Sequence, residues 1–171
     1  MTSAEHPASE TWAPYRWFVA AREQLAWFPL SILQLAMRIG VGSVFFKAGL
    51  LKYGSWELTV KLFQDEYKVP VLPPEVAARM AMFQELTIPI LLFLGLGTRL
   101  ATLPLLGMIA VIQTFVYPNA WTDHLTWGSI LIFLLTRGPG VFSVDYLIEQ
   151  SLSKRSHEPI HQRPGPSHQP K

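Results

Sequence analysis

Apolar residues gather in four long runs along the middle of the 171-residue chain, and polar residues gather at its two ends. The runs cover residues 30–53, 75–96, 98–117 and 121–137. A membrane-spanning helix needs about 20 mainly apolar residues, with a range of about 17–25. The first three runs meet this length, and the fourth meets it if its polar beginning lies at the interface. The pattern predicts an all-α fold, a transmembrane four-helix bundle.

Shorter elements are expected on both sides of this bundle. Residues 1–29 form a polar N-terminal arm, and its part 12–29 contains three tryptophans and apolar residues near helical spacing. We interpret that part as an interfacial helix; the alternative is a soluble amphipathic arm that packs on a partner. Residues 30–150 form the membrane domain, and 151–171 form a polar tail expected to be disordered.

Local signals refine the membrane domain. Pro89 and Pro104 should kink the second and third spans. The segment between the first two spans should contain a short surface helix with Trp56 and Phe63 on one face. Ser143 should cap a further helix whose apolar face lies in the interface, so interfacial helices are expected on both flanks.

The composition supports a membrane protein and excludes several classes of catalytic and cofactor site. Half of the residues are hydrophobic and only 15% are charged, against about 25% in an average soluble domain. The chain has no cysteine, which excludes disulfides, thiolate catalysis and cysteine-ligated iron–sulfur clusters. His124 is the only histidine between the arm and the tail, so we expect no haem and no metal site. A net charge of +2 without a basic aromatic patch predicts no nucleic-acid partner.

The distribution of Lys and Arg predicts the orientation. An even number of spans places both termini and the turn at 97–98 on one side of the membrane. That side carries eight basic residues, and the other side carries four. By the positive-inside rule both termini are cytoplasmic, and His124 faces outward.

Three charged residues lie deep inside the predicted spans, away from the span ends, where each costs roughly 2.5–3.5 kcal/mol on insertion scales. They are Arg38, Lys47 and Glu85, and Gln113 lies at a similar depth. Matching depths in antiparallel spans predict an Arg38–Glu85 pair, with Lys47 as a second partner of Glu85 or as a partner of Gln113. Such a pair can simply fix helix register, or the four residues can line a polar cavity for a quinone head group or a proton path.

One face of the first span carries small and polar residues at helical spacing. Arg38, Gly42, Phe45, Gly49 and Lys52 recur at steps of four, three, four and three. The two glycines allow another backbone to approach closely, so this stripe should face the bundle interior.

The beginning of the fourth span allows two interpretations. Asp123 can cap the helix, while Trp121 and Trp127 belong to an interfacial aromatic belt. Alternatively, Lys52, Asp123 and His124 meet at an outer rim, where the histidine exchanges protons or hydrogen-bonds a quinone carbonyl. We keep all five residues as a candidate outer rim.

The order and spacing of several motifs resemble the DoxX family over about residues 30–150. The matching features are Arg38, "FFKAGLLK" at 45–52, Glu85, "GLGTRLATL" at 95–103, "WTDHLTW" at 121–127 and "RGPGVFSVDYLIE" at 137–149. The resemblance implies a small four-helix, multi-pass protein of the bacterial inner membrane. Relatives include the quinone-reactive subunit of archaeal thiosulfate:quinone oxidoreductase. The corresponding polar or small positions here are Arg38, Gly49, Lys52, Glu85, Arg99, Asp123 and His124.

One departure from the family pattern concerns catalysis. Some relatives have a histidine directly before the glycine of the first span, where this chain has Ala48. This difference disfavours a mechanism that needs two histidines. The leading hypothesis is a subunit of a quinone-linked membrane redox system, which as an enzyme would be the membrane subunit of a quinone oxidoreductase. It would contact the lipid bilayer, a quinone and a redox partner protein. The alternatives are a non-enzymatic scaffold for a redox or metal-handling partner, and a small-solute transporter that acts as a homo-oligomer.

Overall fold

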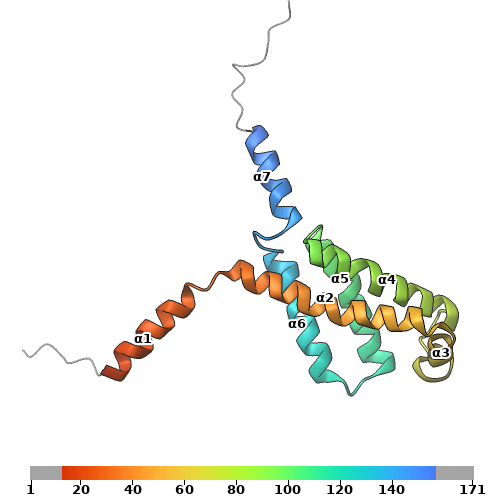
Figure 1. Ribbon diagram of the computed structural model, residues 1–171. Helices are drawn as coiled ribbons and strands as arrows, with labels where there is room; N and C mark the ends of the chain where they lie inside the picture. The colour runs from red at the N-terminus through yellow and green to blue at the C-terminus, as the bar shows by residue number, and fades with distance from the viewer. Residues whose placement is uncertain (1–12, 157–171) are drawn as a thin grey trace, which may run out of the picture. The chain divides into compact units, whose positions relative to one another are not determined.

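The computed structural model describes residues 13–156, and every regular element within this range is helical (Figure 1). Contacts divide the chain into two compact units, Met1–Leu30 and Ser31–Lys171. The first unit contains α1 (Ala13–Ala26), which matches the helix expected within 12–29 and leaves its aromatic side chains exposed. The polar residues expected before it lie outside the described residues. The second unit contains α2 (Leu30–Gly54) from its second residue onward. It also contains α3 (Trp56–Leu62), η1 (Phe63–Tyr67), α4 (Pro74–Leu94), α5 (Thr98–Val111), η2 (Ile112–Val116), α6 (Trp121–Arg137) and α7 (Val144–Ser156).

Three of these helical segments are long and apolar enough to cross a membrane. They are α2, α4 and the continuous segment Thr98–Val116, which joins α5 to η2. Their bounds agree with the first three predicted spans to within two residues. The residues of the fourth predicted span form a helix, α6, which has 17 residues and is shorter than the other three. Among the described residues, length and composition therefore support three spans.

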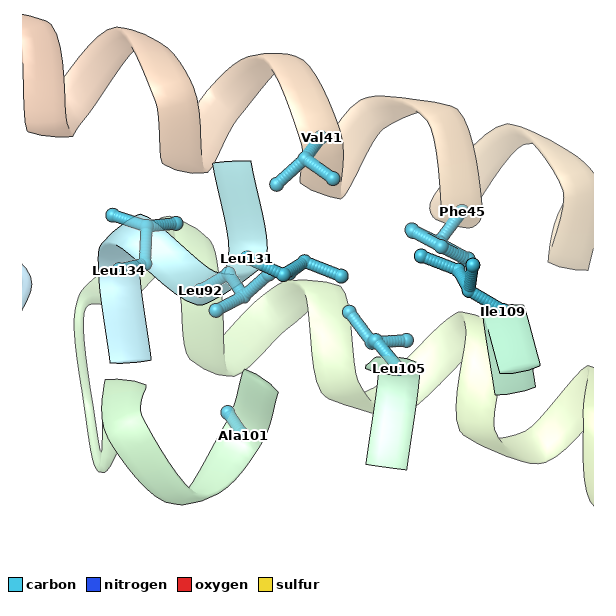
Figure 2. Packing of buried hydrophobic residues seen from close by; sticks show 8 residues of the cluster. All are labelled: Val41, Phe45, Leu92, Ala101, Leu105, Ile109, Leu131 and Leu134. Carbon is cyan, nitrogen blue, oxygen red and sulfur yellow. The ribbon is translucent and has the colours of Figure 1, made fainter. Parts of the chain in front are cut away.

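The four long helices share one hydrophobic core (Figure 2). Val41 and Phe45 of α2 and Leu92 of α4 belong to this cluster, and α5 and α6 complete it with Ala101, Leu105, Ile109, Leu131 and Leu134. In Figure 2 Phe45 lies beside Ile109. Only 22–28% of the most apolar window of each candidate span is buried. Most apolar side chains on these helices therefore face outward, as lipid-contacting side chains do.

The glycine stripe of α2 faces inward, as predicted. Arg38, Gly42, Phe45 and Gly49 are buried. A Cβ on Gly42 would lie 2.6 Å from Cε1 of Phe93, and a Cβ on Gly49 would lie 3.0 Å from Cβ of Glu85. The two glycines therefore let α4 pack closely against α2.

The connecting segments also follow the sequence signals. The short helix after α2 is observed as α3, and Phe63 of η1 packs on Ala77 and Ala78 of α4. Pro89 lies inside α4, and Pro104 lies inside α5.

The segment after α6 is capped as expected but extends further than expected. The hydroxyl of Ser143 accepts a hydrogen bond from the amide of Tyr146 at 3.2 Å, so Ser143 caps α7. This helix continues to Ser156. The prediction of disorder is therefore wrong for residues 151–156, and the rest of the expected tail, 157–171, lies outside the described residues.

Candidate functional site: a cavity beside a buried ion pair

The buried carboxylate of α4 pairs with the lysine at the end of α2. Lys52 Nζ donates to Oε1 of Glu85 at 2.8 Å and lies 2.7 Å from Oε2. The Glu85 side chain is 5% exposed, and the Lys52 side chain is 19% exposed. Oε2 is buried without a directional hydrogen bond from any described residue. The predicted Arg38–Glu85 pair is therefore wrong.

The reason is the longitudinal position of α4 against α2. Cβ of Glu85 lies beside Gly49, and Gly49 is eleven residues beyond Arg38, about 16 Å along a helix that rises about 1.5 Å per residue. Lys52 is one helical turn from Gly49 on the same face. Glu85 is therefore within reach of Lys52 and out of reach of Arg38.

Arg38 instead connects three parts of the fold. It is fully buried, Nη1 donates to the carbonyl of Leu92 at 3.3 Å, and Nη2 donates to the carbonyl of Phe142. One turn earlier, Gln34 donates to the carbonyl of Gly138 at 3.1 Å. Arg38 thus ties α2 to the end of α4 and to the turn after α6. Its role here is structural, and it does not line the cavity described below.

Two other residues of the predicted polar cavity also lie elsewhere. Lys47 is exposed on α2, and its side chain forms no ion pair within residues 13–156. Gln113 does not contact Lys47, because its amide oxygen meets His124 and its amide nitrogen donates to the carbonyl of Pro118 at 2.6 Å. Of the four residues expected to form this cavity, Glu85 lines the cavity described next, and the other three do not.

A cavity of about 640 Å³ lies beside the ion pair. All four long helices and both π-helical segments contribute to its wall, which is mainly apolar and includes several aromatic side chains. The apolar and aromatic lining includes Val44, Phe45, Ala48, Phe63, Tyr67, Val69, Leu72, Ala77, Ala81, Gly107, Met108, Val111, Ile112, Val116, Tyr117 and Trp127. The polar lining consists of Lys52, Gln84, Glu85, Asp123 and His124.

Most of the predicted outer rim lines this cavity. Lys52, Asp123, His124 and Trp127 all belong to its wall, whereas Trp121 is 59% exposed and does not. Asp123 lies in the first turn of α6, where a carboxylate is favoured by the helix dipole. The capping position belongs to Ala120 and has no side-chain hydrogen bond, so the prediction that Asp123 caps the helix is wrong.

His124 is held in one orientation. It is 6% exposed, its Nδ1 lies 2.5 Å from Oε1 of Gln113, and its ring centroid lies 5.8 Å from that of Trp127. The Gln113 amide is oriented by Pro118, so its oxygen faces the imidazole. An amide oxygen only accepts, so Nδ1 carries the hydrogen and Nε2 is an acceptor in the neutral ring.

Sequence reasoning missed the aromatic contact between η1 and η2. The hydroxyl of Tyr117 donates to Oε1 of Glu66 at 2.8 Å, and its ring lies edge-on to Tyr67 at 5.7 Å. Hydrogen bonding with Tyr67, burial and the Glu66 carboxylate together raise the pKa of Tyr117. Tyr67 and Tyr117 both line the cavity. Nothing in the sequence places Tyr117 against η1.

Comparisons with known proteins agree with the motif resemblance. The DoxX family model matches residues 33–118. A protein of Haemophilus influenzae described as an uncharacterized protein is 28% identical over 132 residues, which cover 71% of this chain and 87% of that protein. No solved structure is significantly similar to the chain.

Proposed function

The chain belongs to the DoxX family and is an integral membrane protein, and from this premise we propose that it binds a quinone as a subunit of a membrane redox system. The partner that exchanges electrons with the quinone is proposed to be a second protein. The observation that supports this function best is the apolar cavity beside the Lys52–Glu85 pair.

The proposed topology has four spans in the bacterial inner membrane. In this topology α6 is the fourth membrane-spanning helix, with Trp121 and Asp123 in the interfacial region. Both termini are cytoplasmic in this proposal, because the larger group of basic residues lies on their side. The cavity then lies toward the outer face, since it is lined by the end of α2 and the beginning of α6.

The cavity fits a quinone in size and chemistry. Its volume of about 640 Å³ falls within the roughly 300–1,000 Å³ of typical ligand pockets, which are mainly apolar with a few polar groups. A quinone ring is flat and apolar at its faces, which suits Phe45, Tyr67 and Trp127. Its carbonyl oxygens accept hydrogen bonds, and Lys52 is a charged donor on the cavity wall.

The polar groups also suit the reduced form of the ligand. A bound quinone would be converted to its quinol by gaining two electrons from the redox partner and two protons. Oε2 of Glu85 is buried without a directional hydrogen bond, so it can accept a hydrogen bond from a hydroxyl. Nε2 of His124 is a second acceptor when the ring is neutral. Lys52 keeps the Glu85 carboxylate paired inside the apolar wall.

A matched pair of glycine variants tests the proposal. Gly107 lines the cavity and Gly40 does not, and a Cβ on either glycine would meet no atom within 4 Å. Gly107→Leu should fill the cavity, whereas Gly40→Leu adds the same side chain elsewhere. Both replacements remove a helix-interior glycine, so each changes helix propensity by a similar amount, up to about 1 kcal/mol.

The measurement is quinone retention and thermal stability in detergent. Wild-type protein and Gly40→Leu should carry ubiquinone or menaquinone after purification, and a short-chain ubiquinone should raise their melting temperature. A ligand at 100 times its Kd stabilises by about 2.7 kcal/mol. Gly107→Leu should lose both signals. A wild-type protein without quinone and without a thermal response would refute the proposal. Equal responses from all three proteins would show that the quinone binds elsewhere, which would also refute it.

A further inference from the structure

A second pocket lies at the other ends of α5 and α6, and we propose that it binds the phosphate of a phospholipid headgroup. The pocket has a volume of about 450 Å³ and is formed by the beginning of α5, the end of α6, the turn 138–140 and the first turns of α7. The quinone cavity is lined by the opposite halves of α5 and α6. The two sites are therefore separate, and this inference does not depend on quinone binding.

Two guanidinium groups supply the charge that a phosphate needs. Arg99 lies in the first turn of α5, Arg137 is the last residue of α6, and both line the pocket. A Cβ on Gly138 would lie 3.6 Å from Nε and Nη2 of Arg99, so this side chain lies over the turn that follows Arg137. Neither arginine forms an ion pair with a carboxylate in the described part of the chain. Arginine is well suited to phosphate because its planar donors bind two oxygens at once.

The carboxylates of the pocket do not cancel this charge. Asp145 is already engaged, because Oδ1 accepts from the amide of Gly97 at 2.7 Å and Oδ2 accepts from the amide of Thr98 at 3.0 Å. Glu149 is the other carboxylate of the wall. Asp145 also interacts electrostatically with the buried guanidinium of Arg38. Three guanidinium groups against two carboxylates leave a net positive charge, which favours an anion.

The apolar part of the wall favours a lipid over free phosphate. Leu100, Val141 and Ile148 line the same pocket and are 75%, 45% and 46% exposed. They stand beside the arginines at the end of two apolar helices, where the headgroup layer of a bilayer begins. A diacyl phospholipid places its phosphate at this level and its chains against such side chains. Basic pockets between transmembrane helices commonly bind lipid headgroups in this way.

The test is a titration of lipid into the full-length protein in detergent, with the melting temperature of the protein measured at each lipid concentration. Dioleoylphosphatidylglycerol should raise the melting temperature of the wild type, whereas dioleoylglycerol, which has the same chains without the phosphate, should not. Inorganic phosphate at the same concentration should also have no effect. The double variant Arg99→Gln/Arg137→Gln should need at least about tenfold more phosphatidylglycerol to reach the midpoint of this shift, because it loses charge-assisted hydrogen bonds to the phosphate. Lys154→Gln removes a cation of α7 outside the pocket and should titrate as the wild type does.

A second double variant is the control for misfolding of the glutamine variant. Arg99→Lys/Arg137→Lys keeps both charges but removes the planar donors, so its midpoint should fall between those of the wild type and the glutamine variant. Equal midpoints for the wild type and the glutamine variant would overturn the proposal. It would also be overturned if dioleoylglycerol matched the phospholipid, or if inorganic phosphate alone reproduced the shift, which would indicate a site for a free anion.

Discussion

Removing the positive charge at Lys52 should leave the carboxylate of Glu85 buried without its partner. Lys52→Met keeps a long flexible apolar side chain and removes the ammonium group that lies 2.7–2.8 Å from both carboxylate oxygens. The side chain of Glu85 is 5% exposed, so its carboxylate would lose the partner that compensates its burial. The expected result is a large loss of stability.

The magnitude follows from the unequal exposure of the two partners. Breaking a buried ion pair from one side costs about 3–5 kcal/mol. Lys52→Met should fall at the lower end, about 3 kcal/mol, because the pair has one partly exposed member. Glu85→Gln should cost less, about 1–2 kcal/mol, because Lys52 is already 19% exposed and can turn toward water. The double variant has no buried charge and should lose about 1–2 kcal/mol in total, which gives a coupling of at least about 2 kcal/mol.

The assay is equilibrium unfolding in mixed micelles, followed by circular dichroism at constant pH. A parallel cycle with Arg38→Gln and Glu85→Gln serves as the control, because Arg38 binds backbone carbonyls rather than Glu85. Its losses should be additive within about 0.5 kcal/mol. A second comparison is the exposed Glu75–Arg79 pair on α4, whose coupling should not exceed about 0.5 kcal/mol.

Additive losses in the Lys52–Glu85 cycle would refute this reasoning. Strong coupling in the Arg38–Glu85 cycle would show that the pairing expected from helix depth is the correct one. A large loss in Lys52→Met that disappears when the pH is lowered would still support the pair, because protonation of Glu85 removes the uncompensated charge.

Two further predictions concern packing and pH. Gly49→Ala should destabilise the protein by about 1–3 kcal/mol, because its Cβ would lie 3.0 Å from side-chain atoms of Glu85 and Leu86. The control is Gly40→Ala, whose Cβ would meet nothing within 4 Å and which should be neutral or stabilising in the same unfolding assay. Equal losses in the two variants would contradict close packing at Gly49. The raised pKa of Tyr117 means that the unfolded phenol ionises first, so stability should fall as pH rises above about 10. In Tyr117→Phe the melting temperature should fall less over that range, and an unchanged slope would contradict the prediction.

The helices could be predicted from the sequence because their signal is local. Apolar run length fixed α2, α4 and the segment from α5 through η2 to within two residues. The inward face of α2 was also predictable, because its glycines and polar residues recur at helical spacing. Ser143 was found as a cap because its position before a helix is itself a sequence signal.

The partner of Glu85 could not be predicted, because it depends on how far α4 slides along α2. Depth was estimated from the ends of each apolar run, and those ends do not specify the contact between Gly49 and Glu85. The same limit applies to His124 and Gln113, eleven residues apart, whose contact depends on the turn after η2.

Pro89 lies inside α4, four residues after Glu85. Proline has no amide hydrogen, so the backbone carbonyl of Glu85 receives no helical hydrogen bond from position 89. The residue that carries the buried charge therefore also carries a main-chain oxygen released from the helical ladder. α4 is held together by one backbone bond fewer at the depth of the ion pair, so bending of this helix would be concentrated there. The Lys52–Glu85 contact thus lies where α4 lacks this hydrogen bond, and bending of α4 there would change the cavity wall and the ion pair together.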